Sequence, residues 1–259
     1  MELVISFIAF IFGASIGSFL NVLIDRLPKE ENINGRSHCD HCGKKIAWYD
    51  LFPIISFIFL KARSRCCKKK LSFQYPLIET ITGLIFIFIT KQYAVIDWQQ
   101  IIILLSFLGV ASCLIVIFVS DLKYHLISDY ILLALFIFSF IFHLSNNVII
   151  EQWSNYLISA LIVAFPIWLI YFISKERAMG LGDVYLSAIM GFLLGWKEGL
   201  LALYIAFIKG AIFGLVLILM KNKKLKSKVA FGPFLVIGTV LMLIWGEMIL
   251  KITGSIYGF

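Results

Sequence analysis

Apolar stretches long enough to cross a lipid bilayer recur along almost the whole sequence, and they limit the possible fold more than any other feature. A hydrocarbon core of about 30 Å takes about 20 apolar residues in a helix to cross. The stretches lack the alternation of barrel strands, so helices are predicted. Hydrophobic residues make up 61% of the chain, which excludes an ordinary soluble domain. We expect eight spanning helices: 3–24, 77–92, 99–119, 127–146, 154–173, 183–195, 198–220 and 230–250.

The second and sixth of these segments are short, so seven spans or a re-entrant segment are alternatives. The first segment differs from a signal peptide, because Glu2 precedes it whereas Arg26 and Lys29 follow it. An N-terminus outside then places all but four of the 23 lysine and arginine residues on the inner side, as the positive-inside rule requires. The inner segments are predicted to be 26–76, 120–126, 174–182 and 221–229.

The net charge of +8 needs no nucleic acid as a partner, because basic loops facing an anionic inner leaflet explain it. We therefore expect a multi-pass protein of the inner, cytoplasmic membrane whose partner is the lipid bilayer. Its predicted parts are a first span (1–25), a cytosolic loop domain (26–76) and a polytopic membrane domain (77–259).

The loop domain holds four of the five cysteines: Cys39, Cys42, Cys66 and Cys67. The first two form a CxxC pair, and the second two follow at about the interval of a zinc ribbon. Thiols on the reducing side of a membrane favour metal coordination over disulfides. Adjacent side chains diverge, so His38 or His41 is an alternative fourth ligand, and free thiols are the alternative to a metal. Cys113 lies in an apolar segment and is expected to be a buried thiol.

Two aspartates stand at predicted helix ends on the same inner side. Asp121 ends the third span, and Asp183 opens the sixth within the glycine-containing sequence GLGDVY. Two carboxylates held a few ångströms apart cannot readily both ionise, and aspartic proteases use such a pair to activate water and polarise a carbonyl. The alternative is that each aspartate caps a helix or is a solvated flank. Asp129 is predicted to be an N-cap of this kind.

The chain resembles the type IV prepilin peptidases, which are inner-membrane aspartyl proteases of the GxGD type. The resemblance covers nearly the full length and rests on several blocks in order: GSFLNVLIDRLP (17–28), IAWYDLFPIISF (46–57), LSFQYPLIE (71–79), DLKYHLISD (121–129), GLGDVYL (180–186) and FGPFLVIG (231–238). It implies an all-α polytopic membrane protein of about eight spans with a small zinc-ribbon-like loop.

The resemblance also implies an activity. Asp121 and Asp183 match the two catalytic aspartates of the family. The implied reaction removes the short basic leader of a prepilin or pseudopilin at the cytosolic face. Family members typically also methylate the new N-terminal amine with S-adenosylmethionine, and the loop is associated with that second activity. Zinc ligation by Cys39, Cys42 and Cys67 is implied as well, with Cys66 or a histidine completing the site.

The chain departs from the family pattern at several positions. Ser64 stands where the second CxxC pair usually begins, Cys67 matches its second cysteine, and Cys66 is additional. Methylation is therefore less firmly implied than cleavage. Ser128 and Ala230 replace usual prolines, and Tyr185 replaces a frequent lysine.

Three further polar residues lie in predicted spans. Glu79 opens the second span, where the helix dipole favours a carboxylate, and a role in binding the cofactor is an alternative reading. Lys209 lies near the middle of the seventh span, where it pairs with an acid, reaches the interface or has a function. Asn21 is predicted to hydrogen-bond between helices.

Three other functions stay open. One is a peptidase without methyltransferase activity. Another is a proton-coupled transporter, although transporter acids usually lie near the bilayer midplane within inverted repeats. The last is an anchored zinc loop that docks a partner, for which neutralising Asp121 or Asp183 would have no effect.

Overall fold

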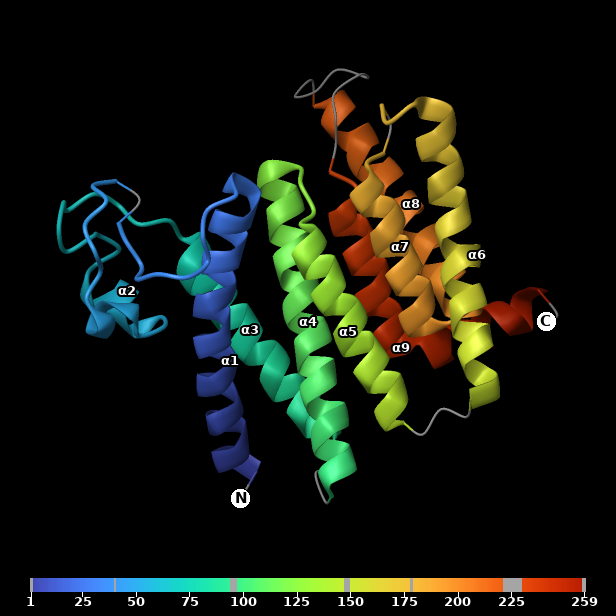
Figure 1. Cartoon of the computed structure of the whole chain (residues 1–259), viewed down its shortest axis with the longest axis horizontal. Helices are drawn as coiled ribbons and strands as arrows, with labels where there is room; N and C mark the ends of the chain where they lie inside the picture. Colours follow the sequence, from blue (N-terminus) through green and yellow to red (C-terminus); the bar gives the residue numbers. More distant parts are fainter. Residues whose placement is uncertain are drawn as a thin grey trace. The chain divides into compact units, whose positions relative to one another are not determined.

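The computed structural model describes residues 2–39, 41–93, 97–146, 150–177, 179–220 and 230–257. Helices account for most of these residues, and within the described ranges no strand is formed beyond isolated bridges (Figure 1). The α-helices are α1 (Glu2–Arg26), α2 (Ile55–Phe59), α3 (Gln74–Gln92), α4 (Trp98–Tyr124), α5 (Asp129–Ser145), α6 (Ile150–Ser174), α7 (Leu181–Leu194), α8 (Trp196–Leu219) and α9 (Gly232–Tyr257). The all-helical prediction is confirmed.

Each of the eight predicted segments coincides with one helix, and the bounds agree within four residues except at the C-terminal ends of α4 and α9, which extend five and seven residues further. Among the described residues, five helices are long and apolar enough to cross a membrane: Glu2–Lys29, Trp98–Tyr124, Gln152–Ser174, Trp196–Leu217 and Gly232–Ile252. The apolar helices α5 and α7 are shorter. The chain is thus a multi-pass membrane protein, and the number of eight spans stays a prediction. The inner segment 221–229 lies outside the described residues.

The chain divides into two compact units, Met1–Val116 and Ile117–Phe259. In the first unit, α1 and α3 pack against each other at glycines. A Cβ atom on Gly17 would lie 2.8 Å from the Cα of Glu79, so only a hydrogen side chain allows this approach. Asn21 Nδ2 donates to the Tyr75 carbonyl of α3 at 3.2 Å. Its predicted role between helices is confirmed.

The apolar core of the first unit joins α3 to the first part of α4. Phe86, Ile89 and Leu108 are buried together there. Residues 27–73 lie between α1 and α3 and contain the short helix α2, two 3₁₀ helices (Leu27–Lys29 and Trp48–Leu51) and two isolated bridges. This segment forms the loop domain, whose turns carry the cysteines.

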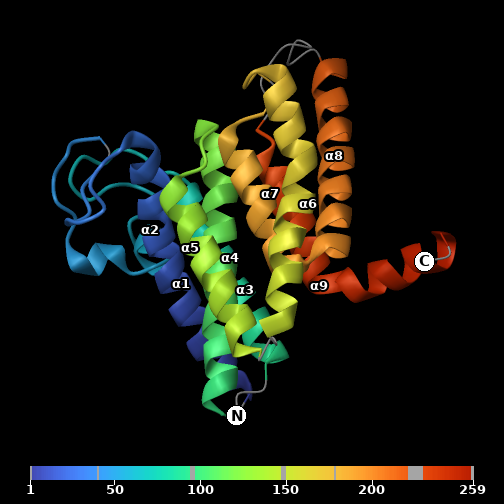
Figure 2. The same cartoon turned by 45° about the vertical axis from the view of Figure 1, so that its right-hand side comes forward.

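Helix α7 is the inner helix of the second unit. It contacts α5, α6, α8 and α9 (Figure 2), and most of its residues are buried. Close packing at glycine explains the tight fit, because a Cβ on Gly191 of α7 would lie 2.5 Å from the Ser159 carbonyl oxygen of α6. Gly238 of α9 approaches the Ala202 carbonyl of α8 in the same way. The packing therefore holds the N-terminal end of α7, with Asp183, inside the unit.

Candidate functional site

Asp121 and Asp183 are both buried in the second unit, with 6% and 9% of their surface exposed. Asp121 lies in the last turn of α4, and Asp183 lies in the first turn of α7. Both side chains come from helix ends, where backbone groups free of intrahelical bonds are available as partners. Burying a carboxylate without such partners would cost several kcal/mol.

Asp121 is held by a backbone amide that lies far away in the sequence. The Gly232 N–H donates to Asp121 Oδ2 at 2.9 Å. Gly232 is the first residue of α9, so the carboxylate faces the positive end of that helix dipole. A Cβ on Gly232 would lie 2.7 Å from Asp121 Oδ2 and 3.2 Å from Ile127 Cδ1. The position therefore requires glycine.

Asp183 is fixed within its own helix start. Its Oδ2 accepts a hydrogen bond from the Gly180 N–H at 3.2 Å, which is one half of a capping box; glycine has no side chain to form the other half. The neighbouring Gly182 packs on the loop before α5, since a Cβ there would lie 3.0 Å from Ile127 Cβ. The glycine beside Asp183 thus contacts Ile127.

Ile127 packs against a glycine near each of the two carboxylates. Its side chain touches Gly182, the neighbour of Asp183, and Gly232, the hydrogen-bond donor to Asp121. The structure thus places the two aspartates in one buried site, although 62 positions of sequence separate them.

The prediction for Asp129 is wrong by one residue. The N-cap of α5 is Ser128, whose backbone is extended, and Asp129 is the first helical residue. The Ser128 carbonyl accepts from the amides of Ile131 and Leu132, which begins the helix. Asp129 is exposed and stands in the first turn, where the helix dipole favours its charge.

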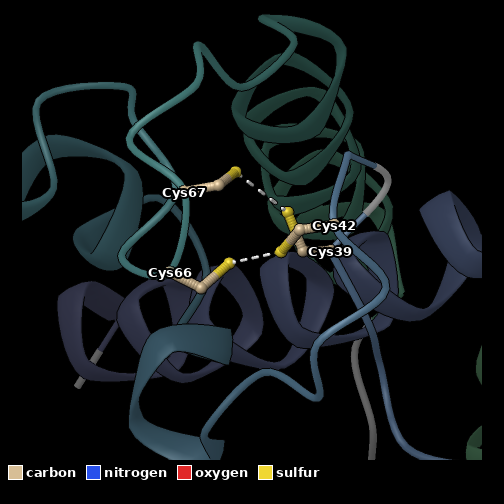
Figure 3. Close-up of side chains that lie close together, drawn as sticks. All are labelled: Cys39, Cys42, Cys66 and Cys67. Atoms are coloured by element: carbon tan, nitrogen blue, oxygen red, sulfur yellow. Dashed lines mark hydrogen bonds between the residues drawn. The ribbon is translucent and has the colours of Figure 1, made fainter.

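The four loop cysteines of the first unit gather in one cluster (Figure 3). Their Sγ atoms all lie within 4.8 Å of one another, and the distances are 3.7 Å for Cys39–Cys67 and 3.0 Å for Cys42–Cys66. Tetrahedral zinc with bonds of about 2.3 Å would separate its sulfur ligands by about 3.8 Å. The sulfur atoms are therefore close to the arrangement that this ion requires. His38 and His41 are outside the group.

The thiols of this cluster differ in acidity. Burial raises the pKa of Cys39, but hydrogen bonds from Ser64 and from the His41 and Cys42 backbone outweigh it and lower the pKa to about 6. The hydrogen bond with Cys66 raises the pKa of Cys42 to about 12. The pKa values of Cys39 and Cys42 are therefore shifted in opposite directions.

A cavity of about 650 Å³ lies in the first unit beside the cysteines. Residues of α1, the loop and α3 line it, among them Asn21, Asp25, Arg26, Lys45 and Glu79. Its size is that of cofactor pockets, and its walls combine acidic, basic and apolar groups. The cavity is thus a further place, beside the aspartate site and the cysteine cluster, where polar side chains of the described residues converge.

Glu79 stands in the wall of this cavity and is 7% exposed. Its Oε2 accepts a hydrogen bond from the Ile54 N–H at 2.7 Å. Ile54 has φ 61° and ψ −49°, a conformation that β-branched residues rarely adopt, and the Ile55 N–H closes a tight turn onto the Pro53 carbonyl at 2.5 Å. Glu79 thus fixes a strained turn at the cavity, and its carboxylate also accepts a hydrogen bond from the Ser18 side chain.

Two residues of these sites carried no recognisable role in the sequence. Arg26 is 8% exposed and donates to the Asn32 and Ile33 carbonyls at 3.1 Å each, so it holds the start of the loop. Gly232 supplies the amide to Asp121. The block FGPFLVIG marked its neighbourhood, but only the fold reveals which carboxylate the amide meets. Lys209 is exposed on α8.

Two sequence profiles match the chain. One is described as the bacterial peptidase A24 N-terminal domain and covers residues 11–93, and the other is the type IV leader peptidase family and covers residues 108–215. Relatives named prepilin leader peptidase/N-methyltransferase match over most of their length. The one from Pectobacterium carotovorum is 31% identical over 90% of this chain and 91% of its own. The one from Aeromonas salmonicida is 30% identical over 94% and 92%.

A more distant relative with the same name, from Pseudomonas aeruginosa, is 25% identical over 96% of this chain and 93% of its own. No solved structure matches the chain. The coverage and identity of these matches show that the chain belongs to the type IV leader peptidase family.

Proposed function

We propose that this protein removes the leader peptide of type IV prepilins or pseudopilins and then methylates the new N-terminal amine, with Asp121 and Asp183 as the catalytic pair. The observation that carries the proposal is the single buried site that both aspartates share through Ile127. Family membership and the names of the relatives support both activities.

The pair supplies the acid and the base for peptide hydrolysis. One ionised carboxylate takes a proton from water, whose oxygen attacks the scissile carbonyl carbon, while the other carboxyl donates its proton to the carbonyl oxygen. The tetrahedral intermediate then breaks at the C–N bond, and the leaving amine takes up a proton. Gly180 and Gly182, which flank the helix start at Asp183, let a substrate backbone come close.

The placement of the pair suits a substrate that is itself anchored by a helix. Both aspartates lie at helix ends, so a peptide bond just outside the apolar part of a prepilin could meet them. We place this site on the cytosolic side of the inner membrane, because the basic segments predict that orientation. Within this proposal, the domain boundaries are those expected from the sequence, and no nucleic acid takes part.

S-adenosylmethionine, the methyl donor, fits the cavity of the first unit. The volume of about 650 Å³ suits a ligand of this size, and acidic groups in the wall suit its positive charges. Asp25 and Glu79 would hold its cationic groups, and Lys45 would hold its carboxylate. When bound, it supplies an electrophilic methyl group, which only an unprotonated amine can accept. Glu79 also fixes the turn at Ile54, so it shapes the pocket in either case.

A zinc ion bound by Cys39, Cys42, Cys66 and Cys67 completes the proposal. Four sulfur atoms within 4.8 Å of one another form a closed set, which suits a structural ion with no open coordination position. The ion would hold together two turns of a loop that contains little regular structure. Since the cavity borders Cys39 and Cys66, this support extends to the proposed cofactor pocket.

The test of the peptidase uses membranes containing the chain, incubated with a prepilin and analysed on a gel for the loss of a leader-sized fragment. We expect cleavage by the native chain and by the control Asp129→Asn, since Asp129 is exposed outside the site. We expect none by Asp121→Asn or Asp183→Asn. Cleavage by either of these variants would refute the catalytic pair and would favour the partner-docking reading. Proton transport by the native chain would support a transporter.

The test of the transferase is mass spectrometry of the mature N-terminus with and without S-adenosylmethionine. We expect a mass increase of one methyl group with the native chain and with the exposed control Glu30→Gln, and a smaller methylated fraction with Glu79→Gln. An unmethylated product of the native chain in the presence of S-adenosylmethionine would refute the transferase activity and would support a peptidase without it.

A further inference from the structure

The cysteine loop contains two turns with the same backbone hydrogen bonds. In the first turn, the chain folds back so that residue 37 pairs with 46, 38 with 45 and 39 with 44. The turn is closed by the Gly43 N–H, which donates to the Cys39 carbonyl at 2.8 Å, and Gly43 has φ 68°. This turn presents its first and fourth residues, Cys39 and Cys42, to the cluster.

The second turn repeats every one of these pairs 25 residues later, which is the separation of Cys39 and Ser64. Residue 62 pairs with 71, 63 with 70 and 64 with 69. The Lys68 N–H donates to the Ser64 carbonyl at 2.9 Å, and Lys68 has φ 60° where the first turn has glycine. A positive φ angle is unfavourable for lysine. The residue at this position therefore does not itself favour the turn, as glycine does in the first turn.

The correspondence assigns each residue of the second turn a place in the first. Ser64 takes the place of Cys39, and Cys67 takes the place of Cys42. Cys66 takes the place of His41, whose ring nitrogen lies 3.3 Å from the Lys70 carbonyl and outside the sulfur group. At the two positions that present cysteines in the first turn, the second turn therefore has the Ser64 hydroxyl and the Cys67 sulfur. The other sulfur atom of the second turn belongs to Cys66, at the position where the first turn has His41, which lies outside the sulfur group.

The Ser64 hydroxyl lies among the sulfur atoms and is buried. Its Oγ is 3.3 Å from Cys39 Sγ and 3.0 Å from Cys66 Sγ. Zinc sites in proteins use thiolates, imidazoles and carboxylates, whereas a neutral serine hydroxyl is a weak ligand. A hydroxyl next to a thiolate can instead donate a hydrogen bond, which orients the ligand and stabilises its charge.

We propose that Cys66 provides the fourth thiolate in place of Ser64, and that Ser64 is a positioning residue whose hydroxyl donates its one hydrogen to one of the two coordinating sulfur atoms beside it, Cys39 Sγ or Cys66 Sγ. The inference rests on the proposed zinc site and extends it. The adjacent cysteines then have different roles. Cys67 occupies the regular second ligand position of the turn, and Cys66 replaces the cysteine ligand that is absent at position 64.

The two positions should then be exchangeable. In the double variant Ser64→Cys, Cys66→Ser, the second turn regains the regular ligand spacing of the first. The number of thiols stays at four, so any change in metal binding reports the position of the sulfur and not its number. This double variant is the rescue for the single variant Cys66→Ser.

The experiment uses the full chain purified in detergent with a reducing agent, titrated with zinc in competition with a chromogenic chelator. We expect Cys66→Ser to bind zinc more than about 100-fold more weakly, because even outer-shell partners of metal ligands contribute 10–100-fold. The double variant should return to within about 10-fold of the native affinity. Ser64→Ala should weaken binding about 10-fold. Cys113→Ala, which changes the remaining cysteine, is the control and should bind like the native chain.

Cobalt(II) in place of zinc gives a second readout. Its sulfur-to-metal charge-transfer absorption grows with the number of thiolates, so the native chain, Ser64→Ala and the double variant should show the four-thiolate intensity. Cys66→Ser should show a lower one. Far-ultraviolet circular dichroism checks that each variant keeps its helices.

The outcomes distinguish a failure of this inference from a failure of the proposed zinc site on which it rests. A native chain that binds no zinc would overturn the zinc site itself. A native chain that binds zinc while Cys66→Ser binds it equally well would leave the zinc site standing and overturn the role of Cys66. A double variant as weak as the single one would overturn the exchange of positions, and an unchanged affinity of Ser64→Ala would overturn the positioning role.

Discussion

The cysteine cluster of the first unit and the aspartate pair of the second are assembled by different kinds of contact. The cysteines lie on turns closed by hydrogen bonds between residues only a few positions apart, and little helical structure surrounds them. The aspartates lie at the ends of packed helices, and the amide that holds Asp121 comes from 111 positions further along. The cysteine ligands are thus positioned by local turns, whereas the carboxyl pair is positioned by the packing of distant helices.

The largest expected effect is a loss of cleavage on substitution of either aspartate, with no change in zinc content. Asp183→Asn or Asp121→Asn removes one member of the acid–base pair. We therefore expect either substitution to lower the cleavage rate by a factor of about 10³ or more. The zinc content of both variants should equal that of the native chain, because the cysteines lie in the other unit. Rates come from timed gel assays and zinc from elemental analysis. A variant that loses zinc along with cleavage would show that the two sites are not independent.

A smaller effect tests the long-range contact. Gly232→Ala would place a Cβ 2.7 Å from Asp121 Oδ2, which forces the carboxylate or α9 to move. Since a displacement of about 1 Å can lower a rate about 100-fold, we expect a loss of that size in cleavage. Gly214→Ala in α8, where a Cβ meets nothing within 4 Å, is the matched control. Equal rates for the two alanine variants would contradict the role of the Gly232 amide.

Removal of zinc should act mainly on the first unit. We expect Cys67→Ser, or a chelator applied to the native chain, to lower methylation about 10-fold more than cleavage, because the cavity borders the cysteine cluster. The measurement is the ratio of methylated to unmethylated mature N-termini at equal extents of cleavage. A ratio that stays constant while zinc is lost would separate the metal from the cofactor pocket.

The smallest effect concerns the turn at Ile54. Glu79→Ala leaves the Ile54 N–H without its acceptor and should destabilise the first unit by about 1–3 kcal/mol. Glu79→Gln retains an oxygen that can accept this bond and should be less destabilising. Thermal unfolding of the purified chain in detergent measures both. If the two variants unfold at the same temperature, the hydrogen bond to Ile54 contributes nothing to stability.

The helices could be predicted because apolar composition alone determines them. Each of the eight apolar segments became a helix, and glycines such as Gly17 and Gly191 permit their close packing. The gathering of the four cysteines followed from their spacing. The N-cap of α5 was misplaced by one residue, because Ser128 and Asp129 are both good caps and only the backbone conformation distinguishes them.

Other features depend on contacts between distant segments and left no pattern to recognise. The Gly232 amide is one of many backbone donors, and only the packing of α9 brings it to Asp121. The strained turn at Ile54 contains none of the glycine that would ordinarily mark a positive φ angle. The place of Ser64 at the start of the second CxxC pair, in contrast, was implied by the family resemblance, and the backbone hydrogen bonds show its equivalence to Cys39.

The shortness of α7 has a consequence for the lipid around the protein. Its 14 residues extend about 21 Å, whereas an ordinary hydrocarbon layer is about 30 Å thick. If α7 spans the bilayer, as the sequence predicts, the two aspartates that we propose as catalytic would sit deeper than the head groups of a bilayer of that thickness, because Asp183 lies in its first turn. The membrane would then have to thin locally around the second unit, or water would have to reach the substrate within it, and in both cases acyl-chain length would determine the hydrolysis rate.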